Sequence, residues 1–372
     1  MLGSPVYFMR HALSLAELAL GYTSPNPAVG AVVVKDGVVV GLGHTQPPGS
    51  AHAEVVALQQ AGDRARGATL YVTLEPCCHQ GRTPPCTGAI IAAGIAKVHC
   101  ALVDPNPLVS GKGIKELKAA GIEVVMGEYE AEAREINEGY IKYITTNLPF
   151  VIAKFAMSLD GKIATKSGDS RWISSGDARD YVHRIRHVVD AIMVGANTVI
   201  NDDPRLSARW CGSSGVTKGG TTRIQPLRVI VDGKGRIPAT AQIFSEPGHT
   251  LIAVARPLAP RKKDRLLSVG AEVVEFESND GIINLSDIFR FLGERQVVSV
   301  LVEGGSKLFG YLFDGGLADK VLAFVSPIII GGQKAKSVVG GVGVEQVAEA
   351  SSLHNVRMTN FDKDILVSGY FQ

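Results

Sequence analysis

The sequence GSAHAE at residues 49–54, followed by EPCCHQGRTPPC at residues 75–86, decides how the first half of this chain folds and what it binds. The first stretch leads into the apolar letters VVAL, so we expect His52 at the start of a helix. The second follows the β-rich run ATLYVTL, so we expect Cys77 at the end of a strand, before a helix that the preceding proline opens. In α/β folds, functional sites gather where strands end and helices begin.

These residues are typical of a zinc site that activates water. A zinc ion bound by one His and two Cys keeps its fourth position for water and lowers the pKa of that water toward neutrality. His-x-Glu followed by Pro-Cys and a second Cys is the signature of the zinc nucleobase deaminases. We therefore expect zinc ligands at His52, Cys77 and Cys86, with Glu54 as general acid and base. The alternative is a helix-start histidine near two cysteines that are buried as small hydrophobic residues.

The loop between the two ligand cysteines is unusually long. Eight residues separate Cys77 from Cys86, in place of the shorter P-C-x-x-C spacing. Together with NPAVG at residues 26–30 and the His-Ala-Glu triplet, this loop resembles the bifunctional riboflavin-biosynthesis deaminase/reductases. The segment KFAMSLDGK at residues 154–162 resembles the opening of their reductase domain, a relative of dihydrofolate reductase. The resemblance covers essentially the whole chain.

For the first half, the resemblance implies hydrolytic deamination of 2,5-diamino-6-ribosylamino-4(3H)-pyrimidinone 5′-phosphate. We expect Arg82, whose planar guanidinium suits phosphate, and Asn26, held between two prolines, to contact that substrate. His44 and His79 are further candidates. The alternative for each of these residues is an ordinary role in a turn or on the surface.

For the second half, the resemblance implies NADPH-dependent reduction of the ribosyl chain to ribityl, with hydride delivered to the C1 carbon of the sugar. The implied cofactor contacts are Ala156, Trp172, Thr198, Asp202, Gly305, Ser306, Lys307, Leu308, Phe309, Gly310 and Tyr311. The implied substrate contacts are Ser170, Arg186, Leu206, Arg209 and Glu303. Of these, Arg186 and Arg209 suit the substrate phosphate, while Lys154 and Glu303 are candidates near the reacting carbon. Lys234 and Arg236 are candidates for the 2′-phosphate of the cofactor.

The letters EGGS at residues 303–306 are the sharpest feature of the second half on the residues alone. They follow an apolar strand and precede a helix expected over residues 307–313. Glycines let a backbone approach a pyrophosphate, and a helix N-terminus supplies N–H donors and a positive dipole end. The alternative is a strand–helix turn that needs glycine for its dihedral angles. Because the pattern is not G-x-G-x-x-G, a Rossmann unit is not supported.

The order of elements predicts an α/β protein of two domains. A hairpin at Asp36-Gly37, then alternating strands and helices, predicts a mostly parallel sheet covered on both faces, closed by one long helix over residues 128–145. We place the boundary after residue 147. Through the resemblance, residues 1–147 are a cytidine-deaminase-like three-layer α/β/α domain, and residues 148–372 are a dihydrofolate-reductase-like α/β domain. Composition also predicts a polar loop over residues 195–209 and a mobile Gly/Ser/Thr-rich segment over residues 211–222.

Composition limits the classes of partner. Lys plus Arg number 38 against 36 Asp plus Glu, so nucleic acid is not an expected partner. No apolar run approaches the length of a membrane span, and the charged start of the chain is no signal-peptide core. Five cysteines, three of them around one motif, argue against a disulfide framework and for a reducing cytoplasm. We expect a small phosphorylated pyrimidine as substrate and, from the resemblance, a homo-oligomer (dimer or tetramer).

Two other function classes remain open. A deaminase of tRNA or nucleosides would share the zinc signature, but the near-neutral charge and the long inter-cysteine loop disfavour it. A non-catalytic assembly protein stabilised by zinc would need a closed four-ligand site, for which Cys78 is the obvious extra ligand. Glu54 would have no role there, because a structural zinc needs no acid or base beside it.

Overall fold

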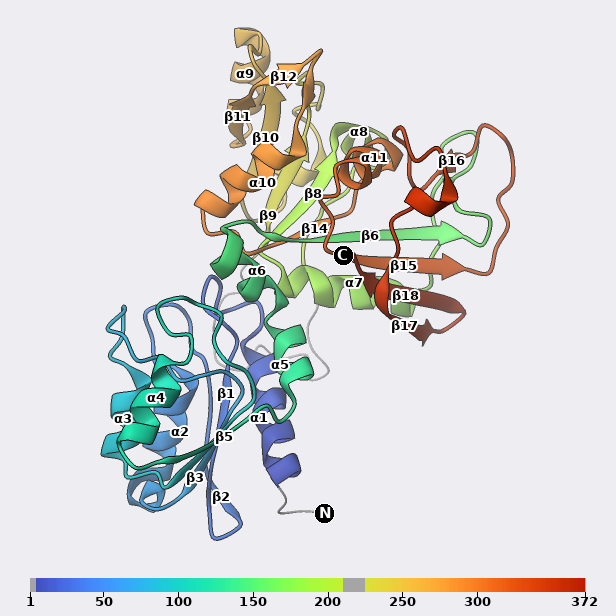
Figure 1. Cartoon of the computed structure of the whole chain (residues 1–372). Coiled ribbons are helices and arrows are strands. Elements are labelled where there is room, and N and C mark those ends of the chain that lie inside the picture. The colour runs from blue at the N-terminus through green and yellow to red at the C-terminus, as the bar shows by residue number, and fades with distance from the viewer. Residues whose placement is uncertain (1–4, 210–224, 372) are drawn as a thin grey trace. The chain divides into compact units, whose positions relative to one another are not determined.

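The computed structural model describes residues 5–209 and 225–371 of the chain (Figure 1). The chain divides into two compact units, residues 1–147 and residues 148–372. The segment 211–222, for which composition predicts mobility, lies outside the described residues. In the part of the chain that is described, none of the helices combines the length and the hydropathy needed to cross a bilayer.

The first unit is built on a five-stranded sheet in the order β2-β1-β3-β4-β5. Its strands are β1 Gly30–Lys35, β2 Val38–His44, β3 Thr69–Val72, β4 Lys97–Cys100 and β5 Glu123–Met126. The expected hairpin is present, with β1 antiparallel to β2, but β1 also pairs antiparallel with β3. Only the pairs β3–β4 and β4–β5 are parallel among the described strands of this unit. The sheet is therefore mixed rather than mostly parallel, because the hairpin strand lies inside the sheet and not at its edge.

Helices cover both faces of this sheet. They are α1 Pro5–Ala19, α2 Ala53–Ala61, α3 Cys86–Ala92, α4 Lys112–Ala119, α5 Glu130–Ile136 and α6 Glu138–Thr146. Figure 1 shows α1 and α5 on one face and α2, α3 and α4 on the other, which gives three α/β/α layers. Helix α2 lies very close to β2, since a Cβ on Gly43 would come within 2.2 Å of the Ala53 carbonyl oxygen. Glycine at this position brings the start of α2 onto the sheet.

The prediction of a single helix over residues 128–145 is wrong. The segment forms two helices, α5 and α6, which meet at a break at Asn137. There the backbone leaves the helical region, with φ −107° and ψ 19°. The buried Asn137 side chain accepts a hydrogen bond from the Ala28 N–H at 2.8 Å and donates one to the Ala28 carbonyl at 3.0 Å. This amide pair ties the C-terminal helices to the loop that precedes β1.

The second unit is built on a nine-stranded sheet in the order β11-β10-β9-β8-β14-β6-β15-β18-β17. Strands from β11 to β15 in that order are parallel, and β18 and β17 add an antiparallel hairpin at the edge. The strands are β6 Phe150–Ser158, β8 Ala191–Gly195, β9 Leu227–Val231, β10 Thr250–Ala255, β11 Glu272–Phe276, β14 Ser299–Val302, β15 Lys320–Ser326, β17 His354–Phe361 and β18 Asp364–Tyr370. Alternate strand residues enter two separate hydrophobic clusters, one on each face of the sheet.

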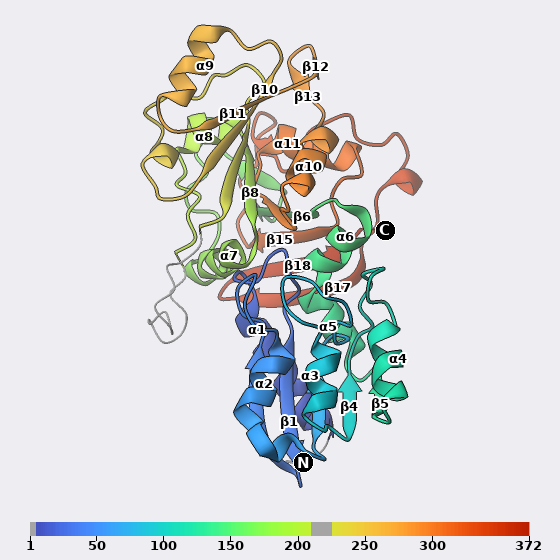
Figure 2. The ribbon, with the colours of Figure 1, turned by 90° about the vertical axis from the view of Figure 1, so that its left-hand side faces the viewer.

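Five helices cover the two faces of this sheet in the described residues. They are α7 Gly176–Val188, α8 Ala196–Asp202, α9 Pro260–Leu267, α10 Leu285–Glu294 and α11 Ser306–Asp314. Figure 2 shows α7, α8 and α9 on one side of the sheet and α10 and α11 on the other. The prediction of a polar loop over residues 195–209 is wrong for the first part of that range. Helix α8 forms there and buries Ala196 and Val199 against the sheet.

Short strands complete the second unit. Two small sheets pair β12 Ser278–Asn279 with β13 Ile282–Ile283, and β7 Lys162–Ala164 with β16 Lys336–Ser337. These strands were not expected from the sequence, since two or three residues are too few to display a periodic pattern. They matter for the site, because β7, β13 and β16 all contribute residues to a cavity beside α8 and α11.

Candidate functional site

Three expected metal ligands converge in the first unit. His52 is the N-cap of α2, with an extended backbone, and Cys77 lies in the loop after β3. Cys86 is the first residue of α3, directly after Pro85. The helix that we expected the proline before Cys77 to open does not form there, and the helix begins only at Cys86. The loop after β3 and two helix starts thus bring the three side chains together.

The distances between the ligand atoms suit a zinc ion. The Nδ1 atom of His52 lies 3.6 Å from Cys77 Sγ and 3.3 Å from Cys86 Sγ. All three atoms lie within 4.8 Å of one another. Bond lengths of about 2.3 Å to sulfur and about 2.0 Å to nitrogen place tetrahedral N and S ligands roughly 3.5 Å apart. The donor set and its spacing therefore fit tetrahedral zinc and leave one coordination position for water.

Glu54 lies in the first turn of α2, two residues after the His52 N-cap, and is only 4% exposed. Burial, and then the nearby Cys77 sulfur, raise the pKa of this carboxyl to about 7. The pKa of the Cys77 thiol is instead lowered to about 4, chiefly by its hydrogen bond with Cys86. The site thus combines a sulfur that readily becomes a thiolate with a carboxyl that can hold a proton near neutrality.

Two residues that sequence reasoning missed support the site. Thr83 Oγ1 lies 3.3 Å from Nε2 of His52, the ring nitrogen opposite the ligand atom, and so fixes the orientation of the ring. The buried Glu75 accepts hydrogen bonds from the backbone N–H groups of Asp104, Gly111 and Ile114, at 3.2, 2.9 and 3.1 Å. It anchors the loop after β3, just before Cys77, to the loop after β4 and to the start of α4. For both residues, the signal that the sequence offered was their position in or next to the two motifs.

The other expected residues of this unit lie on loops and strand ends. Asn26 is half-buried in a turn, where its N–H donates to the Thr23 carbonyl at 2.8 Å. His44 ends β2, half-buried, and burial lowers its pKa. In the inter-cysteine loop, His79 is half-buried while Arg82 is exposed. An exposed guanidinium on a loop next to the ligands is available to an incoming anion.

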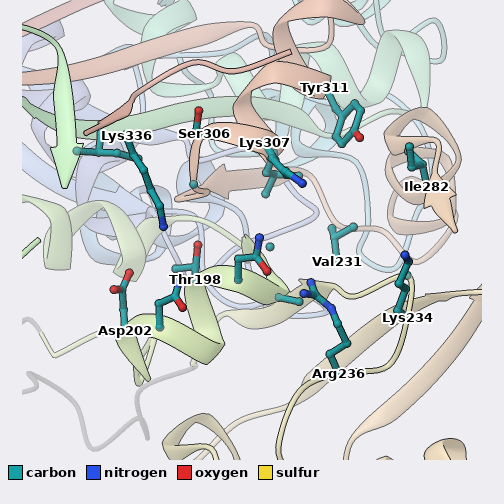
Figure 3. Close-up of a pocket in the computed structure, with 18 of the residues that line it drawn as sticks. Thr198, Asp202, Val231, Lys234, Arg236, Ile282, Ser306, Lys307, Tyr311 and Lys336 are labelled. Carbon is teal, nitrogen blue, oxygen red and sulfur yellow. The ribbon is translucent and has the colours of Figure 1, made fainter. Parts of the chain in front are cut away.

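The second unit holds a cavity of about 550 Å³ (Figure 3). Ten of the expected residues line it: Ser170, Thr198, Asp202, Lys234, Arg236, Gly305, Ser306, Lys307, Leu308 and Tyr311. Gly305 is the N-cap of α11 and brings no side-chain cap, so the cap residue offers no side-chain acceptor to the first N–H groups of that helix. A Cβ on Gly305 would sit 3.5 Å from Thr198 Oγ1. The expected strand–glycine–helix turn therefore borders a space large enough for a nucleotide cofactor.

Four expected cofactor contacts are absent from the described lining of the cavity. Phe309 is fully buried and packs edge-on against Phe155, with ring centroids 5.5 Å apart. A Cβ on Gly310 would lie 2.5 Å from the Gly341 nitrogen, so this glycine permits close packing between α11 and a loop. Ala156 pairs with a β15 residue in the sheet. Trp172 is 72% exposed, with Arg179 4.5 Å above its ring.

Lys154, Arg186 and Glu303 form a buried charged cluster. Arg186 binds both carboxylate oxygens of Glu303, Nε to Oε1 at 2.6 Å and Nη2 to Oε2 at 2.9 Å. Lys154 Nζ lies 3.6 Å from Oε2. Burial alone would raise the pKa of Glu303, but Arg186 and Lys154 outweigh it and lower the pKa to about 2. Burial lowers the pKa of Lys154, while Glu303 opposes that effect. Three expected residues from three different elements are thus brought together.

The remaining expected substrate contacts lie around Asp202 and the segment that follows it. Ser170 Oγ lies 3.5 Å from Asp202, and the Arg171 guanidinium donates to the Asp202 carbonyl. Arg209 is exposed, with Nη2 3.3 Å from Nε2 of His183. Leu206 instead lies in the hydrophobic core. The structure therefore separates the polar expected residues, which face solvent or the cavity, from Leu206.

Several lining residues of the cavity were missed by sequence reasoning. They are mainly small or polar residues of α8 and residues of the short strands, and include Asn197, Asn201, Ile282 and Lys336. Figure 3 shows the ammonium of Lys336 pointing into the cavity on the side of Asp202. No sequence motif marks Ile282 or Lys336, which belong to the short strand pairs β12–β13 and β16–β7.

Comparison with known proteins identifies the family. The family model "RibD C-terminal domain" matches residues 149–367, and "Cytidine and deoxycytidylate deaminase zinc-binding region" matches residues 4–102. The riboflavin biosynthesis protein RibD of Aquifex aeolicus is 41% identical over 360 residues, which cover 97% of this chain and 96% of that protein. The chain belongs to the RibD family.

Solved RibD structures share the fold along the whole chain. A structure of Acinetobacter baumannii RibD superposes with a TM-score of 0.85 at 37% identity, and covers 99% of this chain and 98% of that one. The Thermotoga maritima protein named a diaminohydroxyphosphoribosylaminopyrimidine deaminase/5-amino-6-(5-phosphoribosylamino)uracil reductase gives a TM-score of 0.83 at 38% identity, with the same coverage. The expected fold class, a deaminase-like domain followed by a reductase domain, is confirmed.

As a RibD, the chain is a bifunctional deaminase and reductase of riboflavin biosynthesis. Its cofactors are zinc, for which the first unit carries a His/Cys/Cys site, and NADPH. It acts on a small molecule. The tRNA or nucleoside deaminase and the non-catalytic assembly protein are not favoured by this family membership.

Proposed function

We propose that residues 1–147 deaminate 2,5-diamino-6-ribosylamino-4(3H)-pyrimidinone 5′-phosphate and that residues 148–372 then reduce the ribosyl chain of the product. The ranges of the two family matches and the division of the chain into two units support this assignment. The name of the Thermotoga maritima relative supports the substrate and the order of the steps. The two alternatives that remained open from the sequence lack such support.

In the deaminase, His52, Cys77 and Cys86 would hold zinc, which supplies a bound water of lowered pKa when present. Glu54 accepts a proton from the attacking water and delivers it to a ring nitrogen. It then takes the proton of the new hydroxyl group and passes it to the departing amine. The water oxygen becomes bonded to the ring carbon that loses ammonia, so one water enters and one ammonia leaves. Burial of Glu54 supports this role, because a carboxyl whose pKa lies near 7 can both accept and return a proton at neutral pH.

In the reductase, the cavity beside α8 and α11 would hold NADPH, which supplies the hydride when bound. The start of α11, with Ser306 and Lys307 in the lining, would bind the pyrophosphate, because N–H donors and positive charge stabilise an anion. Lys154, Arg186 and Glu303 would orient the ring-opened sugar for transfer of the hydride to its C1 carbon. The carbon gains the hydride and the adjacent heteroatom gains a proton, which gives the ribityl chain and NADP⁺.

The single observation that carries the proposal is the spacing of His52 Nδ1 and the two cysteine sulfurs next to a buried Glu54. The test is ammonia release from the diaminopyrimidine ribosyl phosphate by the full chain, followed by NADPH oxidation, with zinc content measured on the same sample. We expect one zinc per chain, ammonia release first, and NADPH loss only afterwards. Removal of zinc with a chelator abolishes ammonia release and leaves the reduction of deaminated product intact. NADPH loss without prior ammonia release would overturn the order of steps.

The cellular location and the assembly also belong to this proposal. Free thiols at Cys77, Cys78, Cys86 and Cys100 support a reducing cytoplasm. A homo-oligomer, dimer or tetramer, is supported by exposed apolar side chains on the edge hairpin: Val356 (47% exposed), Met358 (74%) and Ile365 (43%). Sedimentation of the full chain tests this, since a monomer at micromolar concentration would contradict it.

A further inference from the structure

His183, a half-buried residue of α7, lies beside two arginines of the second unit. Its Nε2 atom is 3.3 Å from Nη2 of Arg209, which belongs to the segment after α8. Arg186 follows His183 by three residues, so both side chains lie on the same face of the helix. The histidine ring is therefore placed where it can decide how the neighbouring guanidinium groups meet an anion.

We propose that His183 is a positioning residue of the reductase, which accepts a hydrogen bond from Arg209 and holds that guanidinium ready for the 5′-phosphate of the substrate. The proposal rests on the proposed function of residues 148–372, with Arg209 as the phosphate contact. A guanidinium held in one orientation presents two parallel N–H donors to a phosphate. His183 thus favours phosphorylated substrate without touching it.

The donors of Arg186 are already engaged within the protein. Its Nε and Nη2 atoms donate to the two carboxylate oxygens of Glu303, and Nη1 donates to the Ser207 carbonyl at 3.5 Å. The Arg186 side chain is only 14% exposed, whereas Arg209 is exposed. The guanidinium of Arg209 is therefore the one that an incoming phosphate reaches first, and a residue that orients it sets how the phosphate is recognised.

The hydrogen bond with Arg209 determines the protonation of the His183 ring. A guanidinium only donates, so Nε2 must be the acceptor and carry no proton. The proton of the neutral ring is then on Nδ1, a buried atom that has no hydrogen-bond partner among the described residues. Burial, Arg186 and Arg209 lower the pKa of His183 to about 4. Glu303 and Asp180 act more weakly in the other direction, so the ring is neutral at pH 7.

The backbone just before Arg209 is held separately, by the side chain of Gln225. The Ala208 N–H donates to Gln225 Oε1 at 2.9 Å, and Gln225 Nε2 donates to the Ala208 carbonyl at 3.3 Å. Ala208 is 1% exposed, and the nearby Leu206 keeps a left-handed φ of 51°, which is uncommon for leucine. The base of the Arg209 side chain thus has a fixed position. The direction of its flexible stem remains to be set, and His183 sets it.

A neutral ring suits this role better than a carboxylate. A carboxylate would bind Arg209 as Glu303 binds Arg186, and would compete with the phosphate for the same donors. A neutral nitrogen acceptor orients the guanidinium and leaves its positive charge for the substrate. Because the stem is ordered before the phosphate arrives, binding loses less entropy, which corresponds to about twofold to tenfold in affinity.

The experiment measures kcat and KM of NADPH oxidation by the full chain, with the deaminated ribosyl phosphate and with the same compound lacking its phosphate. We expect His183→Ala to raise the KM for the phosphorylated substrate by about twofold to tenfold, while kcat and the KM for NADPH stay unchanged. The rate with the unphosphorylated compound should equal that of wild type. His183→Gln should restore the low KM, because its amide oxygen can accept from Arg209. His249→Ala, an exposed histidine before β10, is the control and should change neither constant.

The variant Arg209→Ala separates the possible failures. It should raise the KM for the phosphorylated substrate more than His183→Ala does, and His183→Ala should add nothing further in the Arg209→Ala background. If wild type oxidises no NADPH with either compound, the proposed function of the unit is wrong. If Arg209→Ala leaves the KM unchanged, Arg209 is not the phosphate contact and the positioning role falls with it. If Arg209→Ala raises the KM but His183→Ala does not, or if His183→Gln is as impaired as His183→Ala, the function stands and the role of His183 is wrong. Circular dichroism confirms the fold of each variant.

Discussion

Two buried glutamates, one at each site, have opposite ionisation. Glu54 is 4% exposed, and burial raises its pKa to about 7. The Glu303 side chain is 10% exposed, yet Arg186 and Lys154 overcome the effect of burial and lower its pKa to about 2. The same side chain thus becomes a group that exchanges protons at neutral pH in one unit and a permanent anion in the other. The difference lies in the cations within reach of the carboxylate.

This difference matches the division of chemistry between the two units. Deamination needs protons moved between water, ring and amine, which a carboxyl with a pKa near 7 can do. Reduction takes its hydride from a cofactor, so the protein has mainly to hold charges in place. A carboxylate held between two cations does that and exchanges no proton. The two glutamates therefore differ in what a loss of charge would change. At Glu54 it would change the rate of deamination, and at Glu303 it would change stability as well as the position of the sugar.

The largest expected effect is on deamination. Glu54→Gln keeps the size and burial of the side chain but removes its ability to accept a proton, so ammonia release should fall by about 10²- to 10⁴-fold. Zinc content and NADPH oxidation with deaminated substrate should be unchanged. Glu17→Gln, an exposed carboxylate on α1, is the matched control and should leave both rates alone. Ammonia release within about tenfold of wild type would contradict the proton role of Glu54.

At Glu303 the largest expected effect is on stability. Glu303→Gln leaves Arg186 and Lys154 buried without a counter-charge, and should lower the free energy of unfolding of the second unit by about 3–5 kcal/mol. Urea unfolding followed by tryptophan fluorescence measures this, because both tryptophans of the chain, residues 172 and 210, belong to the second unit.

The control is an exposed pair in the same unit. Glu272 lies 2.7 Å from Arg295, with side chains 46% and 43% exposed. Glu272→Gln should cost about 0–1 kcal/mol, since water screens such a pair. An equal loss of unfolding free energy in the two variants would show that burial does not strengthen the ion pair at Glu303.

The sequence predicts the first site more completely than the second, and the reason is physical. The ligands of the first site lie within residues 52–86, in the loop after β3 and at two helix starts, where a short motif fixes their geometry. The sequence therefore predicts His52, Cys77 and Cys86 together with Glu54, and the structure brings them together. Thr83 was missed, although it lies inside the motif, because threonine in a loop has many ordinary roles.

The lining of the second site extends from residue 163 to residue 336. Long-range pairing of short strands creates it, and no local pattern encodes that pairing. The family resemblance predicted cofactor contacts for Phe309 and Gly310 because it covered their whole stretch of α11. A helix that borders a cavity turns only part of its surface toward the cavity. The break at Asn137 was not predicted for a related reason. The partner of its side-chain amide, Ala28, lies far away in sequence.

Acid should weaken the second unit through Glu303. Its folded pKa of about 2 lies below the ordinary value of 4.5, so the unfolded chain binds more protons between these values and stability rises with pH there. The stabilisation is complete above about pH 5 and should shrink by roughly 2 kcal/mol on going to pH 3. Urea unfolding of wild type and Glu303→Gln at both pH values measures it. The gap between the two proteins should narrow at pH 3, and a constant gap would contradict the lowered pKa.

Substitution of Asn137 tests what holds the first site in place. Asn137→Ala leaves the buried N–H and carbonyl of Ala28 without their partners, and should lower the free energy of unfolding of the first unit by about 1–3 kcal/mol. The Ala28 amide should also lose protection from hydrogen exchange. A general loss of stability would instead lower the protection of amides throughout the first unit. Because Ala28 follows the Asn26 loop, the KM of deamination should rise more than kcat falls. Gln80→Ala, an exposed amide in the inter-cysteine loop, is the control for stability. Unchanged exchange at Ala28 in Asn137→Ala would mean that the loop is held by its prolines, and that the first site depends on its short motif alone.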